Sequence, residues 1–498
     1  MNMTTKSAYD QLSKHFKKIH NLSHLSSICG WDQAAMMPAG GNEARSEAMA
    51  ELAVMIHQQS TAPQLADLIK QAQSDQLSTE QQASLAEIDR SWQQANIVPE
   101  ELVSAQSLAG SKCEHAWRTQ RKENDWAGFA KNLKTVVELS REEASIRAQA
   151  NNCSNYDALM DLYEPGMTSA QLDPIFDDVK SWLPELTLAA QEKQKSDKVI
   201  MPTGHFPIAS QQQLGLKTMG ILGFDFNHGR LDVSAHPFCG GVSSDVRITT
   251  RYEEDDFTQS LMGVVHETGH ARYEQGLPTA LNHLPVGQAR SMGIHESQSL
   301  LFEMQLGRSE EFLTLLTPEI KQAFGGTDTA IYNPLNLSQC YTRVKPDFIR
   351  VDADEVTYPA HVMLRYEIEQ ALMNGDIEVD DIPELWALKM QQYLGVDTKG
   401  NYRNGCMQDV HWTDGSFGYF PSYTLGAMYA AQFMTTIKQE MDVSAIITGG
   451  DLSPIFTWLK TNIWQNASLL STNDLVKQAT GETLNPAHFK AHLQARYL

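Results

Sequence analysis

The stretch VHETGH, residues 265–270, places two histidines four residues apart, with a glutamate directly after the first. On an α-helix, residues i and i+4 lie on one face, so His266 and His270 can bind the same metal ion. Glu267 lies beside this face and can reach a water molecule on that metal without being a ligand. Zinc suits the pattern because it accepts imidazole and carboxylate ligands and keeps one position for water, whose pKa it lowers to about 7.

The residues around this motif favour a helix that is at least half buried. Four apolar residues lie between 261 and 265, and Asp255 and Asp256 can cap a helix that runs to about Tyr273. Gly269 weakens such a helix by roughly 0.5–1 kcal/mol relative to alanine, which is easier to understand if another segment must approach closely. The alternative is a surface helix whose histidines and glutamate have no function, and it does not account for the apolar flank.

A third ligand is expected from a second helix. Glu296 lies 26 residues after His270, which leaves room for a helix end, a connection and a returning helix that faces the motif. His295 is the competing candidate. Acidic residues are also common in the first turn of helices, so the residue types alone leave this choice open.

The rest of the chain predicts a mainly α-helical protein. Between Gly229 and Tyr252, two β-branched runs flank a Gly/Ser segment, which predicts a β-hairpin or small sheet just before the metal helix. No repeat of fixed period and no Ser/Gly-rich linker divides the chain, so we expect a single domain over residues 1–498. The expected helices cover residues 43–59, 81–97, 126–149, 169–194, 291–324, 354–374, 384–393, 421–440 and 454–467.

Composition and charge exclude several classes of protein. The net charge of −22 repels phosphate backbones and the only basic cluster is small (Lys14, Lys17 and Lys18), so we expect no nucleic-acid partner. No apolar run reaches the roughly 18 residues of a membrane span, and the N-terminus lacks a signal-peptide pattern. The six cysteines include no CxxC pair, which indicates free thiols. We therefore expect a cytoplasmic enzyme without membrane contact.

Six short motifs follow one another along the chain: HPF (236–238), DVRIT (245–249), HETGH (266–270), HESQS (295–299), IRVDADEVTYPAH (349–361) and GCMQDVHW (405–412). Two further stretches are WDQAAMMP (31–38) and FPSYTLGAMYAAQ (420–432). In their residues and their order these motifs resemble those of the carboxypeptidase Taq family of metallocarboxypeptidases. The resemblance extends through almost the whole chain, and six ordered motifs are far more specific than one HExxH.

The resemblance implies a large, saddle-like helical body with a deep active-site groove, related to neurolysin and angiotensin-converting enzyme. It implies removal of single residues from peptide C-termini with broad side-chain tolerance, a zinc or cobalt ion, and a homodimer. The third ligand would be the glutamate of the HES motif, here Glu296 rather than His295. In thermolysin-like enzymes an acidic residue four positions after the ligand glutamate orients a zinc histidine. That position is Leu300 in this chain, so the partners of the metal histidines are unassigned.

We expect a zinc-bound water, deprotonated by Glu267, to attack the scissile carbonyl, after which Glu267 passes the proton to the leaving amine. The oxyanion that forms needs donors besides the metal. His411 and Tyr423, which flank a Gly/aromatic loop, are the candidates. A histidine beside a tryptophan and a tyrosine at a helix start are also typical of packing, which is the alternative for both.

A carboxypeptidase must recognise a free carboxylate, and the planar fork of arginine matches that group. Arg350 is the candidate because it lies in the matched IRVDAD motif. The alternative is that Arg350 only pairs with Asp352 or Asp354. The substrate class expected from this residue is peptides with a free C-terminus.

A strand over 245–249 places Asp245, Arg247 and Thr249 on one face. They can line the floor of a groove, and the edge of the strand can pair with an extended peptide. An internal salt bridge that braces the metal helix explains these residues equally well. The family match makes His236 a second substrate contact, where its position alone indicates a turn histidine.

Two other functions remain open at this point. The first is an oligoendopeptidase on the same scaffold, which differs from a carboxypeptidase in not needing carboxylate recognition by Arg350. The second is a non-catalytic, zinc-stabilised binding protein. Glu267 argues against the second, because a structural zinc site has no use for a base and fills all four positions with protein ligands. Tyr358 and His361 are expected to pack rather than to take part in chemistry.

Overall fold

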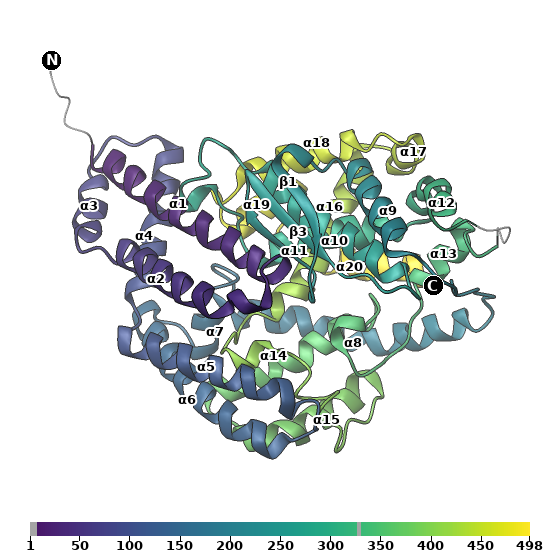
Figure 1. Cartoon of the computed structure of the whole chain (residues 1–498), viewed down its shortest axis with the longest axis horizontal. Coiled ribbons are helices and arrows are strands. Elements are labelled where there is room, and N and C mark those ends of the chain that lie inside the picture. The colour runs from purple at the N-terminus through teal and green to yellow at the C-terminus, as the bar shows by residue number, and fades with distance from the viewer. Residues whose placement is uncertain (1–6, 326–329) are drawn as a thin grey trace.

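The computed structural model describes residues 7–325 and 330–498, and the predicted fold class, mainly α-helical with a small sheet beside the metal helix, is confirmed (Figure 1). In these residues the α-helices are α1 (Ala8–Ala35), α2 (Asn42–Ser60), α3 (Gln64–Ala72), α4 (Thr79–Asn96), α5 (Glu100–Gln120), α6 (Trp126–Asn151), α7 (Asn155–Met160), α8 (Ser169–Gln194), α9 (Ile208–Ile221), α10 (Thr258–Gly276), α11 (Met292–Leu300), α12 (Glu310–Phe324), α13 (Pro334–Tyr341), α14 (Tyr358–Asn374), α15 (Ile382–Leu394), α16 (Pro421–Glu440), α17 (Val443–Gly449), α18 (Ser453–Asn462), α19 (Thr472–Thr480) and α20 (Ala487–Tyr497).

The sheet precedes the metal helix but is not the hairpin that the β-branched runs suggest. Its strands are β1 (Gly229–Val233), β2 (Phe238–Val242) and β3 (Asp245–Thr250), in the order β1-β3-β2. The Gly-containing segment that the sequence predicts as a turn is itself the strand β2, which pairs antiparallel with β3. Because β2 runs back along the sheet, β1 and β3 run in the same direction and pair in parallel. The prediction that the edge of β3 can pair with a peptide is wrong, since β3 is the central strand.

The expected helix over 291–324 is broken. It consists of α11, a π-helical segment η4 (Leu301–Gly307), and α12, whose N-terminus is capped by the side chain of Ser309. In η4 the backbone N–H of Arg308 donates to the carbonyl of Glu303, five residues earlier, which is the hydrogen-bond spacing of a π-helix. Apolar periodicity does not reveal such an insertion, because the side chains on both sides of it remain buried.

Three hydrophobic cores hold these elements together. The largest contains residues from Cys113 to Tyr497, which is consistent with one body, although the single-domain assignment stays a prediction. A second core joins α1, α3 and α4 to the segment that follows α10. The third lies between the sheet, α9 and α10, so the metal helix is fixed on its sheet side by apolar packing. Figure 1 shows α10, α11 and α16 in the middle of the molecule.

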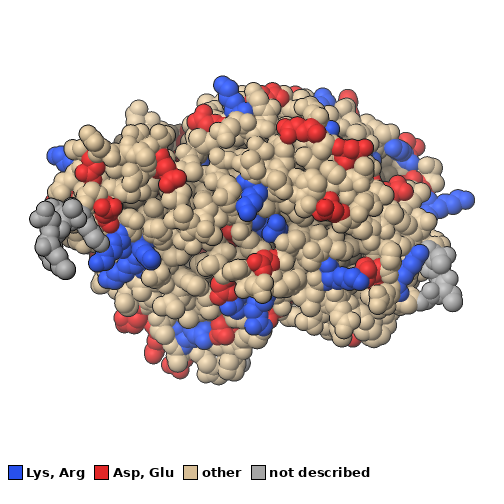
Figure 2. All heavy atoms as spheres, turned by 90° about the horizontal axis from the view of Figure 1, so that it is seen from above, with Lys and Arg blue, Asp and Glu red and all other residues tan. Residues whose placement is uncertain are grey.

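Charged side chains are interspersed on the face of the molecule that Figure 2 shows. Lysine and arginine alternate there with aspartate and glutamate, and that face carries no continuous basic stripe. In the part of the chain that the structure describes, every helix is too short or too polar to cross a lipid bilayer.

Two glycines allow α11 to lie directly between α10 and α16. A Cβ atom on Gly269 of α10 would lie 2.5 Å from the carbonyl oxygen of Gln298 in α11. A Cβ atom on Gly426 of α16 would lie 2.7 Å from the Cβ and Cγ atoms of Glu296. Both distances are shorter than any non-bonded contact allows, so the backbones approach this closely only because both positions are glycine.

We predict that Gly269→Ala and Gly426→Ala each destabilise the protein by about 1–3 kcal/mol, the usual range for overpacking a tight contact. Chemical denaturation measures the change, and elemental analysis should show reduced metal content because Glu296 is displaced. Gly30→Ala in α1 is the matched control, since a Cβ atom there meets nothing within 4 Å. It should stabilise the protein by up to about 1 kcal/mol through helix propensity alone. Equal effects at the three sites would contradict the close approach.

Candidate active site

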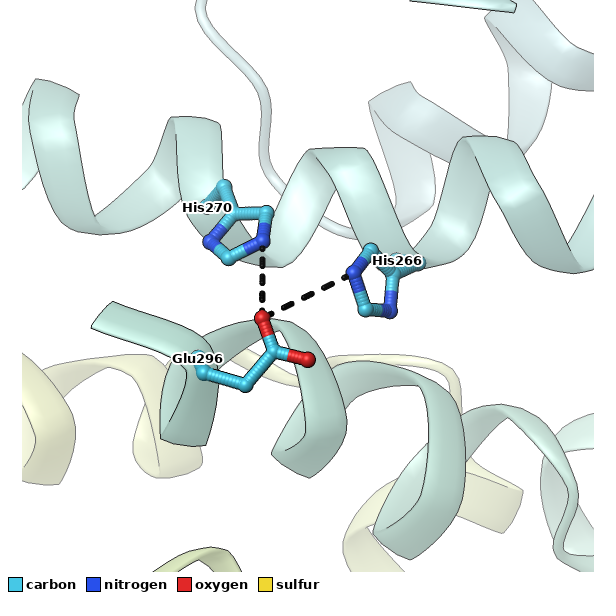
Figure 3. A group of neighbouring side chains, drawn as sticks. All are labelled: His266, His270 and Glu296. Atoms are coloured by element: carbon cyan, nitrogen blue, oxygen red, sulfur yellow. Dashed lines mark ion pairs between the residues drawn. The ribbon is translucent and has the colours of Figure 1, made fainter. Parts of the chain in front are cut away.

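The side chains of His266, His270 and Glu296 converge on one point (Figure 3). Both histidines come from α10, and Glu296 comes from the facing helix α11. The Oε2 atom of Glu296 lies 3.3 Å from Nε2 of His270 and 4.0 Å from Nε2 of His266. One ligand atom from each of the three residues lies within 4.8 Å of the others.

The donor set fits a divalent ion. Each Nε2 atom faces Glu296, whereas each Nδ1 atom has another partner: His266 Nδ1 donates to Glu303 Oε2 at 2.8 Å, and His270 Nδ1 lies 2.6 Å from His295 Nδ1. This leaves two imidazole nitrogens and one carboxylate oxygen facing a common point, which is the ligand number of catalytic zinc sites. The ligand assignment from the sequence stays a prediction that this geometry supports.

His295, the competing candidate, lies behind His270 instead of beside Glu296. Its Nε2 atom is 2.9 Å from Glu274 Oε1, and a carboxylate can only accept this hydrogen bond. The Nδ1 atom of His295 is therefore the acceptor for His270 Nδ1–H, which leaves the Nε2 lone pair of His270 available to a metal. His295 and Glu274 together fix the orientation and tautomer of His270.

The acidic partner of His266 is Glu303, which the sequence did not indicate. Glu303 is buried, and its Oε1 atom accepts a hydrogen bond from Arg308 Nη2 at 2.5 Å. Burial alone raises the pKa of Glu303, but the charges of Arg308 and His266 outweigh it and lower the pKa to about 2. The one available signal is a single acidic residue within the apolar run LLFEMQLG, residues 300–307.

Glu267 is 8% exposed and lies beside the ligand atoms. Burial is the main cause that raises the pKa of its carboxyl to about 7, while the neighbouring His266 lowers it. A carboxylate with a pKa near neutral can both accept and return a proton, which a general base in peptide hydrolysis must do.

Arg350 is almost fully buried, at 4% exposure, in a short 3-10 turn (Arg350–Asp352). Its Nε and Nη2 atoms donate to Asp409 Oδ1 at 3.0 and 2.8 Å, and Nη1 donates to the Tyr358 hydroxyl at 2.5 Å. Asp409 also binds Arg365, whose Nε donates to Oδ2 at 2.7 Å. Two guanidinium groups share one carboxylate, so this arginine cluster, Arg350, Arg365 and Asp409, has a net charge of +1.

The alternative partners considered for Arg350, Asp352 and Asp354, are wrong. The carboxylate of Asp354 accepts hydrogen bonds from the backbone of the following turn, including Thr357 N at 3.0 Å. Tyr358 was expected only to pack, yet its hydroxyl contacts Arg350. His361 is fully buried, and burial lowers the pKa of its ring well below the usual value. The expectation that it only packs stays a prediction.

His411 and Tyr423 lie together, with His411 Nε2 3.1 Å from the Tyr423 hydroxyl. Burial lowers the pKa of His411 to about 4, so the ring is neutral. Tyr423 lies in the first turn of α16, one helical turn before Gly426, which contacts Glu296. Burial raises the pKa of Tyr423, and the charges of Arg350 and Glu296 also act on it. The guanidinium carbon of Arg350 lies 4.8 Å from the centroid of the Tyr423 ring, so Tyr423 contacts the arginine cluster.

Two buried carboxylates that the sequence did not indicate hold these segments. Glu164 accepts hydrogen bonds from the backbone of Gly293 in α11 and from Ser422 Oγ in α16 at 2.7 Å. Glu369 accepts from Trp412 Nε1 at 2.7 Å and from the backbone of Gly418 at 3.0 Å, so it shapes the 411–421 loop. Burial raises the pKa of both carboxyls to about 7, and their hydrogen bonds oppose the shift.

The structure does not bring His236 and Arg247 to the ligand atoms through any contact between described residues. His236 is exposed in the turn between β1 and β2. Arg247 donates to Asp245 Oδ1 at 2.6 Å and lies over the ring of Trp31 in α1, 4.5 Å from its centroid. The internal salt bridge considered for this strand is thus present, and a substrate contact for either residue stays a prediction.

Comparisons with known proteins agree with the motifs. The model of the carboxypeptidase Taq (M32) metallopeptidase family matches residues 11–497. Thermostable carboxypeptidase 1 of Thermus thermophilus is 36% identical over 99% of both chains. The structure of Trypanosoma cruzi metallocarboxypeptidase 1 is 47% identical, with a TM-score of 0.96 over 98% of this chain and 99% of that one. An M32 carboxypeptidase from Deinococcus radiodurans R1 is 29% identical, with a TM-score of 0.94 over 98% of both chains. The family predicted from the sequence is confirmed: this chain belongs to the carboxypeptidase Taq (M32) family of metallocarboxypeptidases.

Proposed function

We propose that the chain is a zinc-dependent carboxypeptidase that releases single residues from the C-termini of peptides with broad side-chain tolerance. The observation that carries this proposal is the convergence of His266 Nε2, His270 Nε2 and Glu296 Oε2 beside the buried carboxyl of Glu267. Two imidazoles and one carboxylate favour zinc among the divalent ions, and cobalt is accepted by the same ligands.

His266, His270 and Glu296 would hold the ion. When bound, a divalent ion polarises the scissile carbonyl and makes water a stronger acid. Glu267 takes a proton from the attacking water while the oxygen of that water bonds to the carbonyl carbon. It then gives that proton to the amine nitrogen as the C–N bond breaks, and the burial that raises the pKa of its carboxyl favours uptake of the proton.

Tyr423 supplies a donor for the oxyanion, and His411 orients it. The Tyr423 hydroxyl is 3.1 Å from His411 Nε2, so a neutral imidazole that donates Nε2–H to the hydroxyl oxygen leaves the hydroxyl proton free for the oxyanion. Tyr423 also lies one helical turn from the contact between Gly426 and Glu296. A preformed donor of this kind is worth about 2.7–4 kcal/mol of transition-state stabilisation in other hydrolases.

Arg350 receives the substrate carboxylate. It has five N–H donors, and three of them are used by Asp409 and Tyr358 among the described residues. The net positive charge of the arginine cluster attracts an anion in a site with little water to screen it. An enzyme that cut internal bonds would bury this charge against an uncharged chain, which disfavours the oligoendopeptidase alternative.

The remaining assignments rest on the sequence and on the family resemblance. A homodimer and a cytoplasmic location stay predictions. So do substrate contacts by His236 and Arg247, whose surroundings in the structure are a turn and a salt bridge.

We predict that Glu267→Gln lowers kcat by about 10²–10⁴-fold, because glutamine cannot take up the proton of the attacking water. Zinc content, measured by elemental analysis, should stay at the wild-type level, since Glu267 is not a ligand. Wild-type turnover in the zinc-loaded variant would refute the role of Glu267 as base.

We predict that the wild type cleaves a peptide with a free C-terminus far better than the same peptide with a C-terminal amide. Arg350→Gln should raise KM for the free acid and remove this preference, since one charge-assisted bidentate contact is worth roughly 1.5–3 kcal/mol per hydrogen bond. Arg118→Gln, which removes only an exposed pair with Glu114, is the matched control and should keep the preference. Equal cleavage of acid and amide by the wild type would contradict the exopeptidase assignment.

We predict that chelation abolishes hydrolysis and that either zinc or cobalt restores it. Mass spectrometry of a mixed peptide digest should then show free amino acids and peptides shortened stepwise from the C-terminus. Internal fragments would identify an oligoendopeptidase, and unchanged activity of the metal-free protein would exclude a metal-dependent reaction.

A further inference from the structure

The last helix, α20, ends against a buried carboxylate that the proposed mechanism does not use. Glu355 is 5% exposed and lies in the loop before α14. It accepts hydrogen bonds from three residues of α20: His492 Nε2 at 2.6 Å, Arg496 Nη1 at 3.0 Å and the Tyr497 hydroxyl at 2.9 Å. Burial alone raises the pKa of Glu355, but His492 and Arg496 lower it below its usual range. The carboxylate is therefore ionised and bound on both oxygens.

Arg496 makes a second contact from the same nitrogen atom. Its Nη1 donates to the backbone carbonyl of Met304 at 2.5 Å. Met304 lies in η4, and carbonyls in the last turn of a helical segment need partners from outside the segment. Arg496 thus caps the carbonyl end of the π-helical segment from the far end of the chain.

The segment that Arg496 caps carries the carboxylate that orients a metal histidine. Glu303 precedes Met304, and it holds both His266 Nδ1 and the guanidinium of Arg308. The charge of Glu355 also acts on Arg308 and raises its pKa further, although burial opposes this. Arg496 is therefore connected to His266 through the backbone of η4, where Met304 follows Glu303.

The other contact of Arg496 leads to the arginine cluster. Glu355 follows Arg350 by five residues and precedes Tyr358 by three, and the Tyr358 hydroxyl accepts a hydrogen bond from Arg350. One guanidinium group thus bridges η4, which supports the metal ligands, and the 350–358 segment, which carries Arg350.

We propose that Arg496 is a positioning residue that fixes η4 against the 350–358 segment. Through Glu303 it sets the orientation of His266 and hence the metal affinity. Through Glu355 it sets the separation between the bound ion and Arg350. The second consequence rests on the proposed function, whereas the first needs only a metal-binding protein.

The test is Arg496→Gln, with zinc affinity of the metal-free protein measured by competition against a chromophoric chelator. Loss of a partner outside the ligand set typically weakens metal binding by 10–100-fold, and we expect about tenfold because Arg496 acts through Glu303. With free-acid peptides, kcat should fall more than KM rises, since binding persists while the scissile bond is misplaced. Arg496→Lys keeps the charge on a shorter side chain, whose ammonium reaches both acceptors less well, so it should fold and bind zinc with intermediate affinity.

Leu493→Ala is the matched control, because Leu493 is a fully buried residue of α20 that is not part of the polar network. It should lower the melting temperature at least as much as Arg496→Gln while leaving zinc affinity unchanged. If all the variants bind zinc as the wild type does, or if zinc affinity only follows melting temperature, Arg496 merely anchors α20 and the proposal is overturned. Weakened zinc binding in an enzyme that cleaves acid and amide peptides equally would uphold the positioning role and refute the carboxypeptidase assignment.

Discussion

The crossing of α11 between α10 and α16 is the contact on which the active site depends. Two histidines on one helix provide only two ligands, and the third must come from a segment that approaches within a few ångströms. Gly269 and Gly426 make that approach possible on opposite sides of α11. The same crossing brings Tyr423 to the metal-ligand group, because Tyr423 lies one turn from Gly426. Glu164 fixes the starts of α11 and α16 relative to each other through one carboxylate.

The two parts of the site have opposite charge. Around the metal ligands lie the three carboxyl groups of Glu267, Glu296 and Glu303, and Arg308 contacts Glu303. Once the imidazoles are neutral, as metal ligands must be, these side chains favour a cation. In the arginine cluster, two guanidiniums face one aspartate, so the side chains favour an anion. Such charges are costly to bury unless a ligand balances them. A divalent ion and a C-terminal carboxylate have the signs that the two parts need, which links the electrostatics of the fold to the choice of an exopeptidase reaction.

The sequence predicted the parts of the site that obey local geometry. The HExxH spacing follows from helical periodicity, and Gly269 indicated a close approach that the structure contains. The helix over 421–440 is found as α16 with the same bounds. The order of the motifs identified the family, and with it Glu296. The strand arrangement was not predictable, because nothing in a Gly-rich segment shows whether it turns or pairs as β2.

The residues that sequence reasoning missed share a physical cause. Glu303, Glu369 and Asp409 each form hydrogen bonds with residues that lie far away along the chain, or on a face of the helix that helical periodicity does not predict. Glu303 lies in the π-helical segment, seven residues after Glu296, whereas the thermolysin-like pattern places the orienting acid four residues after the ligand glutamate. Asp409 pairs with Arg350 across 59 residues of chain, so nearer aspartates seemed the better partners. Only the folded chain reveals such pairings, whereas the metal motif can be read in six consecutive letters. The chemistry is therefore encoded locally, but the orientation of His266, His270 and Arg350 is supplied by hydrogen bonds and ion pairs from other segments of the chain.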